Sequence, residues 1–126
     1  MKIAAKFSSI ILGMIFLIFG LNGLHTFIPM PEYHPFMEMM SSTGFLAVIN
    51  LLEITGGLML IVESYTLLSL LILGPIIFNI LMYHVLIDSR NIVLGFVNLV
   101  LYVIVTSQYW HYFKVFLKSK PRMENL

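Results

Sequence analysis

Glu53 is the residue of this chain whose type and position most strongly indicate chemistry. It lies near the middle of residues 43–62, an otherwise apolar segment long enough to cross a lipid bilayer. A charged carboxylate costs about 2.5–3.5 kcal/mol at the centre of a spanning helix, so such a residue usually faces a protein interior or a wet cavity. None of the apolar segments contains a lysine or arginine that would neutralise it. We therefore expect Glu53 to be protonated, or to pair with a histidine of a neighbouring helix.

Other polar side chains gather in the same half of the expected membrane spans. Asn50 and Glu53 are three residues apart, and Asn79 and Tyr83 are four apart, so each pair shares one face of a helix. We predict that Glu53 and His84 are catalytic. A ligand is predicted to be bound by a further set of polar residues from all four apolar segments, namely Asn22, His25, Asn50, Asn79, Tyr83, Asn98 and Tyr102.

These residue types suit a ligand that exchanges protons. A carboxyl group beside histidine and tyrosine donors is what the headgroup of a quinone needs as it takes up two electrons and two protons, and it also suits proton-coupled transport. We expect Glu53, His84, Asn79 and Asn22 to converge on one cavity in the outer half of the spans. The alternative for the asparagines is structural, because asparagine and glycine at helical spacing commonly hold membrane helices together.

Metal chemistry has little support in the sequence. The chain contains no cysteine, which excludes disulfides and Cys-ligated iron–sulfur clusters. His25 and His84 lie at similar depth and could serve as axial haem ligands, but their place near the outer boundary favours interfacial hydrogen bonding. The candidate zinc ligands differ in depth, and the nine methionines form no cluster suited to copper. We predict no metal site, and quinone is the one cofactor that we consider.

The composition is that of an integral membrane protein. Hydrophobic residues make up 60% of the chain and charged residues only 10%, against about 25% charged residues in soluble domains. The mean hydropathy is +0.97. The net charge of +1 is too small to indicate nucleic-acid binding. The expected partners are the lipid bilayer, a redox partner protein and a second copy of the chain.

Four segments reach the length of a membrane-spanning helix, which is about 20 residues. They are residues 7–27, 43–62, 66–87 and 92–112. Short turns between the later segments favour antiparallel neighbours, so we predict one all-α domain, an up-down-up-down four-helix bundle. The first segment is expected to be retained, because it has no small-residue signal cleavage site. The loop 28–42 contains three prolines, and we therefore predict that it is an irregular cap.

The basic residues predict the orientation. Lys2 and Lys6 precede the first segment, and the residues that follow the fourth are Lys114, Lys118, Lys120 and Arg122. By the positive-inside rule both termini are cytoplasmic, and residues 113–126 form a basic tail. The aromatic run 109–112 is typical of the belt at the inner boundary of a membrane.

The sequence also resembles a known family, the DoxX family of small bacterial and archaeal membrane proteins. The resemblance lies in residues 20–23 (Gly-Leu-Asn-Gly), His25, residues 27–31 (Phe-Ile-Pro-Met-Pro), residues 53–58 (Glu-Ile-Thr-Gly-Gly-Leu), Asn79 and His84. It covers the first three segments and the first loop, and the fourth segment only by length and hydropathy. It implies a four-helix inner-membrane protein and, as in the small subunits of a thiosulfate:quinone oxidoreductase, a quinone-linked role for Asn22, His25, Glu53, Asn79 and His84.

We therefore predict a small membrane subunit of a redox system, which binds quinone or a similar lipid-soluble ligand in a polar cavity. In this mechanism Glu53 exchanges protons, while His84 and Tyr83 donate hydrogen bonds to the carbonyl oxygens of the ligand. Two alternatives are open. One is a non-enzymatic scaffold or assembly partner, and the other is a carrier of small solutes or protons. The sequence does not decide whether the protein is an enzyme.

Overall fold

A computed structural model of the chain describes residues 2–120, and every regular element within them is a helix. The predicted all-α class is confirmed. The helices in chain order are α1 (Ile3–Leu24), α2 (Pro35–Ser42), α3 (Phe45–Ile61), α4 (Thr66–Leu86), α5 (Ile92–Gln108), α6 (Trp110–Phe113) and the 3₁₀ helix η1 (Lys114–Leu117).

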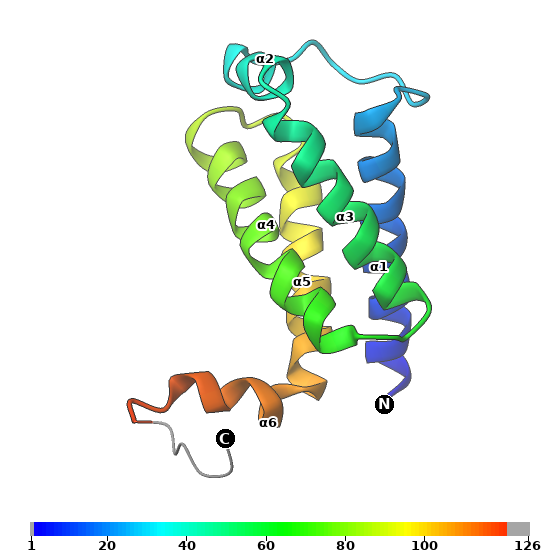
Figure 1. Cartoon of the computed structure of the whole chain (residues 1–126), viewed down its shortest axis with the longest axis vertical. Coiled ribbons are helices and arrows are strands. Elements are labelled where there is room, and N and C mark those ends of the chain that lie inside the picture. The colour runs from blue at the N-terminus through cyan, green and yellow to red at the C-terminus, as the bar shows by residue number, and fades with distance from the viewer. Residues whose placement is uncertain (1, 121–126) are drawn as a thin grey trace.

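The four long helices α1, α3, α4 and α5 lie side by side (Figure 1). Helix α1 contacts α3 and α5, and α4 contacts the same two helices, so the four surround a shared interior. Helix α2 lies across one end of this group, which we call the α2 end. Helix α6 and η1 lie at the opposite end, which we call the α6 end (Figure 1).

The apolar core fills the half of the interior that is nearer the α6 end. Leu12 and Phe16 of α1, Leu60 of α3, Leu73 of α4 and Val105 of α5 are buried there and pack in one cluster. Side chains packed at this density hold their helices in fixed positions, because a change of even one methylene is felt by the neighbours. The core therefore fixes how the four helices enter the other half of the interior, where the polar residues lie.

Helices α1 and α3 touch through their backbones at two glycines. A Cβ atom added to Gly57 would lie 2.6 Å from the carbonyl oxygen of Gly13, and one added to Gly13 would lie 2.7 Å from the carbonyl oxygen of Gly57. Only glycine fits such a contact, and small residues at close helix crossings are typical of membrane helices. A hydrogen bond also connects α4 to α3, since the Ser69 hydroxyl donates to the Gly56 carbonyl oxygen at 2.8 Å.

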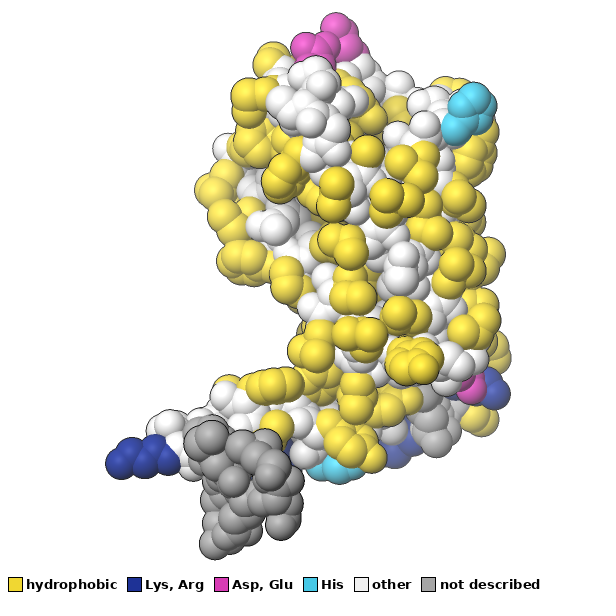
Figure 2. Space-filling model, viewed as in Figure 1, with side chains coloured by type: hydrophobic (Ala, Val, Ile, Leu, Met, Phe, Trp, Pro, Cys, Tyr) yellow, Lys and Arg dark blue, Asp and Glu magenta, His cyan; other side chains and the backbone are white. Residues whose placement is uncertain are grey.

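The outer faces of the long helices are apolar. Large hydrophobic side chains such as Phe7, Val48, Phe78 and Val100 are exposed, one from each of the four. Figure 2 shows hydrophobic side chains over the body of the molecule and charged side chains near its two ends. Two helices, α1 and α4, are long and apolar enough to cross a membrane, each with a mean hydropathy of 2.1. The number rises to four if the bent pairs α2–α3 and α5 with α6–η1 each count as one span.

The first helix differs from the predicted 7–27 segment at both ends. It begins at Ile3 and ends at Leu24. The end has a local cause, because the Oδ1 atom of Asn22 accepts hydrogen bonds from the backbone N–H groups of Phe27 and Ile28, both at 2.8 Å. This draws the chain out of the helix, and His25 is already extended, with a φ of −146°.

The loop after α1 was predicted to be an irregular cap, and its second half is instead helical. Helix α2 begins at Pro35, which is favoured at a first helical position because its missing N–H is not needed there. The Nδ1 atom of His34 caps the helix by accepting from the Phe36 N–H at 3.1 Å. Helix α2 then meets α3 at an angle of 85°. Gly44 forms this corner with a φ of +80°, a conformation that glycine adopts without strain.

The fourth predicted segment, 92–112, is not one straight helix. Helix α5 ends at Gln108, and α6 with η1 leaves it at an angle of 81°. The exposed rings of Trp110 and Tyr112 and the basic side chain of Lys114 lie in the part that turns away. Aromatic and basic side chains favour the boundary of a membrane over its interior, which gives a physical reason for the bend. Of the predicted basic tail, Arg122 and its neighbours from 121 to 126 lie outside the described residues.

Candidate functional site

Two cavities touch Glu53, and the larger of them lies in the half of the interior nearer the α2 end. Its volume is about 960 Å³, and α1 to α5 all contribute to its wall. Most of the lining side chains are apolar, including Phe16, Ile49 and Ile76. The predicted site residues on its wall are Glu53, Asn79, Tyr83, His84 and Asn98. A large apolar pocket with a few converging polar groups is the usual form of a small-molecule site.

Glu53 lies deep in the interior. It is 9% exposed and shares one face of α3 with Asn50, Gly57 and Leu60, which are buried as expected from their helical spacing. Its carboxyl group makes no hydrogen bond or ion pair with any side chain or backbone group of residues 2–120. The predicted pairing with a histidine is therefore not observed in this structure. A buried carboxyl group without a partner is costly, so the interior holds a group that packing does not explain.

Asn79 and Pro75 form part of the α4 wall. Pro75 lies inside the helix and has no N–H, so one carbonyl of the preceding turn loses its usual helical partner. Asn79 lies one turn further along and lines the cavity, although its side chain is exposed as a whole. It can therefore reach both the cavity and the surroundings. The predicted meeting of Glu53, His84 and Asn79 on one cavity is seen here.

A polar network closes the α2 end of the cavity. The guanidinium group of Arg90 donates to the carboxylate of Asp88, at 2.7 Å for the shortest contact, and to the backbone carbonyl oxygen of Glu32 at 2.9 Å. The Tyr83 hydroxyl donates to Asp88 Oδ2 at 3.2 Å. These hydrogen bonds from Arg90, more than any other cause, hold the pKa of Asp88 well below its ordinary value. The network thus ties the long loop before α2 to the turn between α4 and α5.

His84 belongs to the same end of the cavity. Its Nδ1 atom lies 2.9 Å from the backbone carbonyl oxygen of Asp88. A carbonyl oxygen only accepts hydrogen bonds, so we assign the ring proton to Nδ1. In the neutral ring the Nε2 atom is then an acceptor, and it donates only when the ring is protonated. This alters the predicted role, in which His84 donates to a ligand.

Asn98 and Tyr102 share a face of α5 but differ in position. Asn98 lines the larger cavity and is 4% exposed, and its Oδ1 atom has no hydrogen-bond partner within residues 2–120. Tyr102 lines neither cavity. Its hydroxyl donates to the Leu70 carbonyl oxygen at 2.8 Å and so connects α5 to α4. The geometry of Tyr102 is that of a packing residue.

The second cavity, of about 480 Å³, lies between α1, α2 and α3. Asn22, Asn50 and Glu53 line it, so Glu53 stands on the wall of both cavities. Asn22 therefore lies on this cavity and not on the larger one, where it was expected. Its side chain is also already occupied, because Nδ2 donates to the Ile28 carbonyl oxygen at 3.3 Å while Oδ1 binds two N–H groups. His25 is exposed and lines neither cavity.

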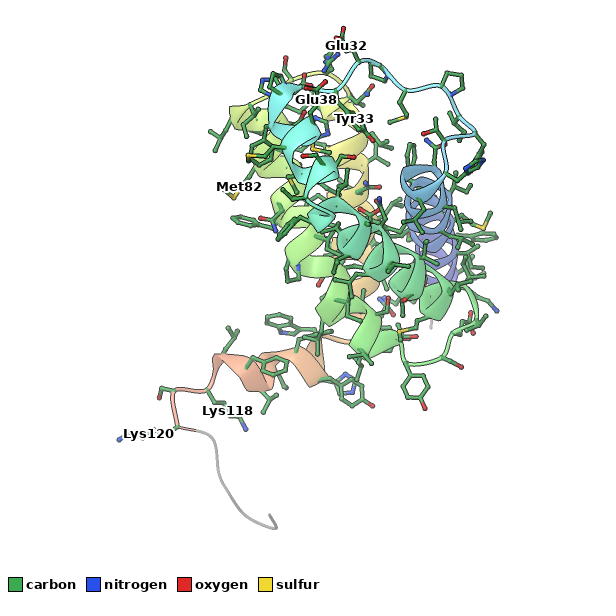
Figure 3. All side chains as sticks on the ribbon, turned by 45° about the horizontal axis from the view of Figure 1, so that its top comes forward. Glu32, Tyr33, Glu38, Met82, Lys118 and Lys120 are labelled. Atoms are coloured by element: carbon green, nitrogen blue, oxygen red, sulfur yellow. The ribbon has the colours of Figure 1, made fainter. Side chains whose placement is uncertain are left out.

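The two ends of the molecule differ in charge. Glu32, Tyr33 and Glu38 lie together at the α2 end in Figure 3, whereas Lys118 and Lys120 lie at the opposite end. Glu38 lines the second cavity and Glu32 the larger one. Neither of these two residues was predicted as a ligand contact, and nor was the pair of Asp88 and Arg90, because none of the four lies within a predicted spanning helix. Within the described part of the chain, no group of three or more His, Asp or Glu residues is placed to hold a metal ion.

Part of the apolar wall of the larger cavity is exposed on α3 and α4. Phe45 and Leu52 of α3 and Met82 and Leu86 of α4 line the cavity and are also exposed, so they form an apolar rim. Figure 3 shows Met82 projecting outward from α4. An exposed wall of this kind would face hydrocarbon if the helices lay in a bilayer.

Comparisons with known proteins assign no family to the chain. No family model, no curated protein and no solved structure matches it. The resemblance to the DoxX family therefore stays a prediction, as do the roles predicted for the site residues.

Proposed function

We propose that α1, α3, α4 and α5 cross the cell inner (plasma) membrane as an up-down-up-down four-helix bundle, with both termini cytoplasmic. The apolar outer faces of these helices support this arrangement. Helices α3 and α5 have 17 residues each, which at 1.5 Å per residue gives about 25 Å, close to the thickness of the hydrocarbon layer. The lysines at the α6 end support a cytoplasmic position for that end.

Within this bundle the larger cavity binds a lipid-soluble ligand. The observation that carries the proposal is the cavity of about 960 Å³, largely apolar and partly exposed on α3 and α4, with the buried carboxyl group of Glu53 on its wall. The apolar rim lets a ligand enter sideways from the hydrocarbon layer. A polar group of the ligand then supplies the hydrogen-bond partner that Glu53 lacks.

A quinone is the ligand class that fits these groups best. Its apolar tail suits the rim, and its ring carries two oxygens that accept hydrogen bonds when oxidised and donate them when reduced. The amide of Asn79 and the protonated carboxyl group of Glu53 donate to a carbonyl oxygen. The Nε2 atom of neutral His84 accepts from a hydroxyl group of the reduced form, so the site holds both states.

In this proposal the chain is the small subunit of a membrane redox system, and a partner protein exchanges electrons with the bound quinone. Glu53 delivers a proton to the ligand when it is reduced and takes one up when it is oxidised. Tyr83 and Asp88, which already bond to each other, shape the end of the cavity rather than contact the ligand first.

The test is direct binding of radiolabelled decylubiquinone to the purified protein in lipid nanodiscs. We expect saturable binding, which Asn79→Trp weakens at least about tenfold, or 1.4 kcal/mol, because the ring occupies part of the cavity and removes the amide donor. Thr55→Trp is the matched control, because Thr55 is exposed on α3 and lines neither cavity. Glu53→Gln should keep binding and insertion but remove the dependence of binding on pH.

Two results would reject the proposal. Binding that is absent from the wild-type protein would favour the scaffold function, in which the buried polar groups only specify packing. Binding that is equally strong in both tryptophan variants would place the quinone outside the larger cavity. Mass spectrometry of quinones that co-purify with the protein then identifies which quinone the cell supplies.

A further inference from the structure

A ligand in the larger cavity would leave Glu53 without water on that side. An apolar ligand that fills the cavity displaces its solvent, and yet a carboxyl group that exchanges protons needs contact with water. The proposed function therefore requires a second way for protons to reach Glu53. The second cavity also reaches Glu53, and it adjoins the larger one, because Phe19 and Leu46 line both.

We infer that the second cavity is an aqueous path that connects Glu53 with the outer face of the membrane. This inference rests on the proposed function, because it assumes the membrane orientation and the role of Glu53 in proton exchange. The path starts at Glu53 and passes Asn50, which lies one turn nearer the α2 end. It then reaches Asn22 of α1, Thr26 of the loop after α1, and Glu38 of α2.

The chemistry of the lining favours water. Half of the side chains that line this cavity can form hydrogen bonds, whereas the larger cavity is mostly apolar. The amide of Asn50 and the carboxyl group of Glu53 have no hydrogen-bond partner within residues 2–120, and neither is sealed from the cavity. A buried water needs two to four polar partners, and these groups provide them. A volume of about 480 Å³ holds on the order of ten waters.

The mouth of the path lies at the α2 end. Thr26 and Glu38 line the cavity and are exposed, so water enters between the loop after α1 and helix α2. Glu38 lies at this end in Figure 3. A carboxylate at the mouth raises the local concentration of protons. In the proton step, the Glu53 carboxylate takes one proton from a hydronium ion in the cavity, which leaves a carboxyl group and a water molecule.

The chain has no cysteine, which allows a clean accessibility test. Asn50→Cys places a thiol in the second cavity alone, and Leu51→Cys places one at the next residue, which is 54% exposed on the outer face of α3 and lines neither cavity. Both proteins are reconstituted in vesicles of known orientation. A charged methanethiosulfonate that does not cross membranes is then added to the outer side.

We expect Asn50→Cys to react at least about tenfold faster than Leu51→Cys, because the reactive thiolate forms in water and not in hydrocarbon. Thr26→Trp, which narrows the mouth, should slow the reaction of Asn50→Cys. Glu53→Cys is a second probe deeper in the same path, and full labelling in detergent with denaturant confirms that each thiol is present.

Equal rates for Asn50→Cys and Leu51→Cys would overturn the inference, as would faster labelling of Asn50→Cys from the cytoplasmic side. The readout needs no quinone, so its failure is distinct from a failure of the proposed function. If quinone binding is absent but Asn50→Cys reacts from outside, the aqueous path stands and its purpose is different.

Discussion

Replacing Glu53 with methionine should make the protein more stable and inactive. Glu53 is 9% exposed and its carboxyl group has no protein partner among residues 2–120, so water in the cavities compensates for its burial only in part. Leaving a buried polar group unsatisfied costs about 1–3 kcal/mol. Methionine is flexible and of similar length, so it fills the same space against the apolar wall. We therefore expect Glu53→Met to raise the free energy of unfolding by about 1–3 kcal/mol.

Asn22 provides the matched comparison, because it is equally buried but fully bonded. It is 3% exposed and binds the N–H groups of Phe27 and Ile28, both at 2.8 Å. A hydrogen bond contributes about 0.5–1.5 kcal/mol, so losing both in Asn22→Leu should lower the free energy of unfolding by about 1–3 kcal/mol. The two variants remove buried polar groups from neighbouring helices, and yet their effects should have opposite signs.

The assay is reversible unfolding in mixed micelles with rising amounts of dodecyl sulfate. Helix content is followed by circular dichroism and the single tryptophan, Trp110, by fluorescence. A change of 1–3 kcal/mol is about a 5- to 150-fold change in the unfolding constant, which this method resolves. Lower stability of Glu53→Met than of wild type would refute the reasoning, because it would mean that the carboxyl group holds helices together. Unchanged stability of Asn22→Leu would refute the comparison.

Packing, charge and topology each provide one further test. Gly57→Ala should lower the free energy of unfolding by about 1–3 kcal/mol, because the added Cβ meets the α1 backbone. Gly95→Ala is the control and should not lower it, because its Cβ would meet no atom closer than 3.4 Å. Thermal unfolding measures both effects. Arg90 lowers the pKa of Asp88 below its ordinary 3.8, so the stability from this pair is complete above pH 3.8 and declines progressively as the pH falls from there through the lower folded value. Arg90→Gln should move the titration back toward 3.8, seen by ¹³C NMR of this single aspartate. Reporters fused at either terminus should be cytoplasmic and one inserted after Pro31 external, and an external C-terminus would contradict the orientation.

Helical spacing predicted well which residues face the interior. Asn50 and Glu53 are three residues apart and both are buried, and Asn98 is buried on α5 as its polarity indicated. This worked because a residue in a regular helix has a direction that depends only on its position along the chain. The depth of each residue within its expected span likewise predicted that Glu53, Asn79 and His84 would line one cavity, and all three do.

The sequence could not show how loops use the polar groups at helix ends. Asn22 was predicted to contact a ligand, but the path of the loop brings two backbone N–H groups onto its oxygen. His84 was predicted to donate to a ligand, and the sequence could not show that the Asp88 carbonyl oxygen lies beside its Nδ1 atom, because that contact exists only in the folded turn. These contacts depend on the conformation of residues outside the helices, which has no periodic signal in the sequence.

The interior has two unlike halves, which explains why positions within the helices were predicted while contacts of the loops were not. Near the α6 end, leucines and the glycine contact of α1 with α3 pack the helices closely, and position follows from residue size. Near the α2 end, cavities separate the same helices, and unpaired groups such as Glu53 and Asn98 Oδ1 make this half costly to form. The packed half supplies stability that offsets the cost of the unsatisfied polar groups in the open half. Glu53 lies where the two halves meet, so its helix is held by the core at Gly57 and Leu60 while its carboxyl group faces the cavities, as a role in proton exchange would require.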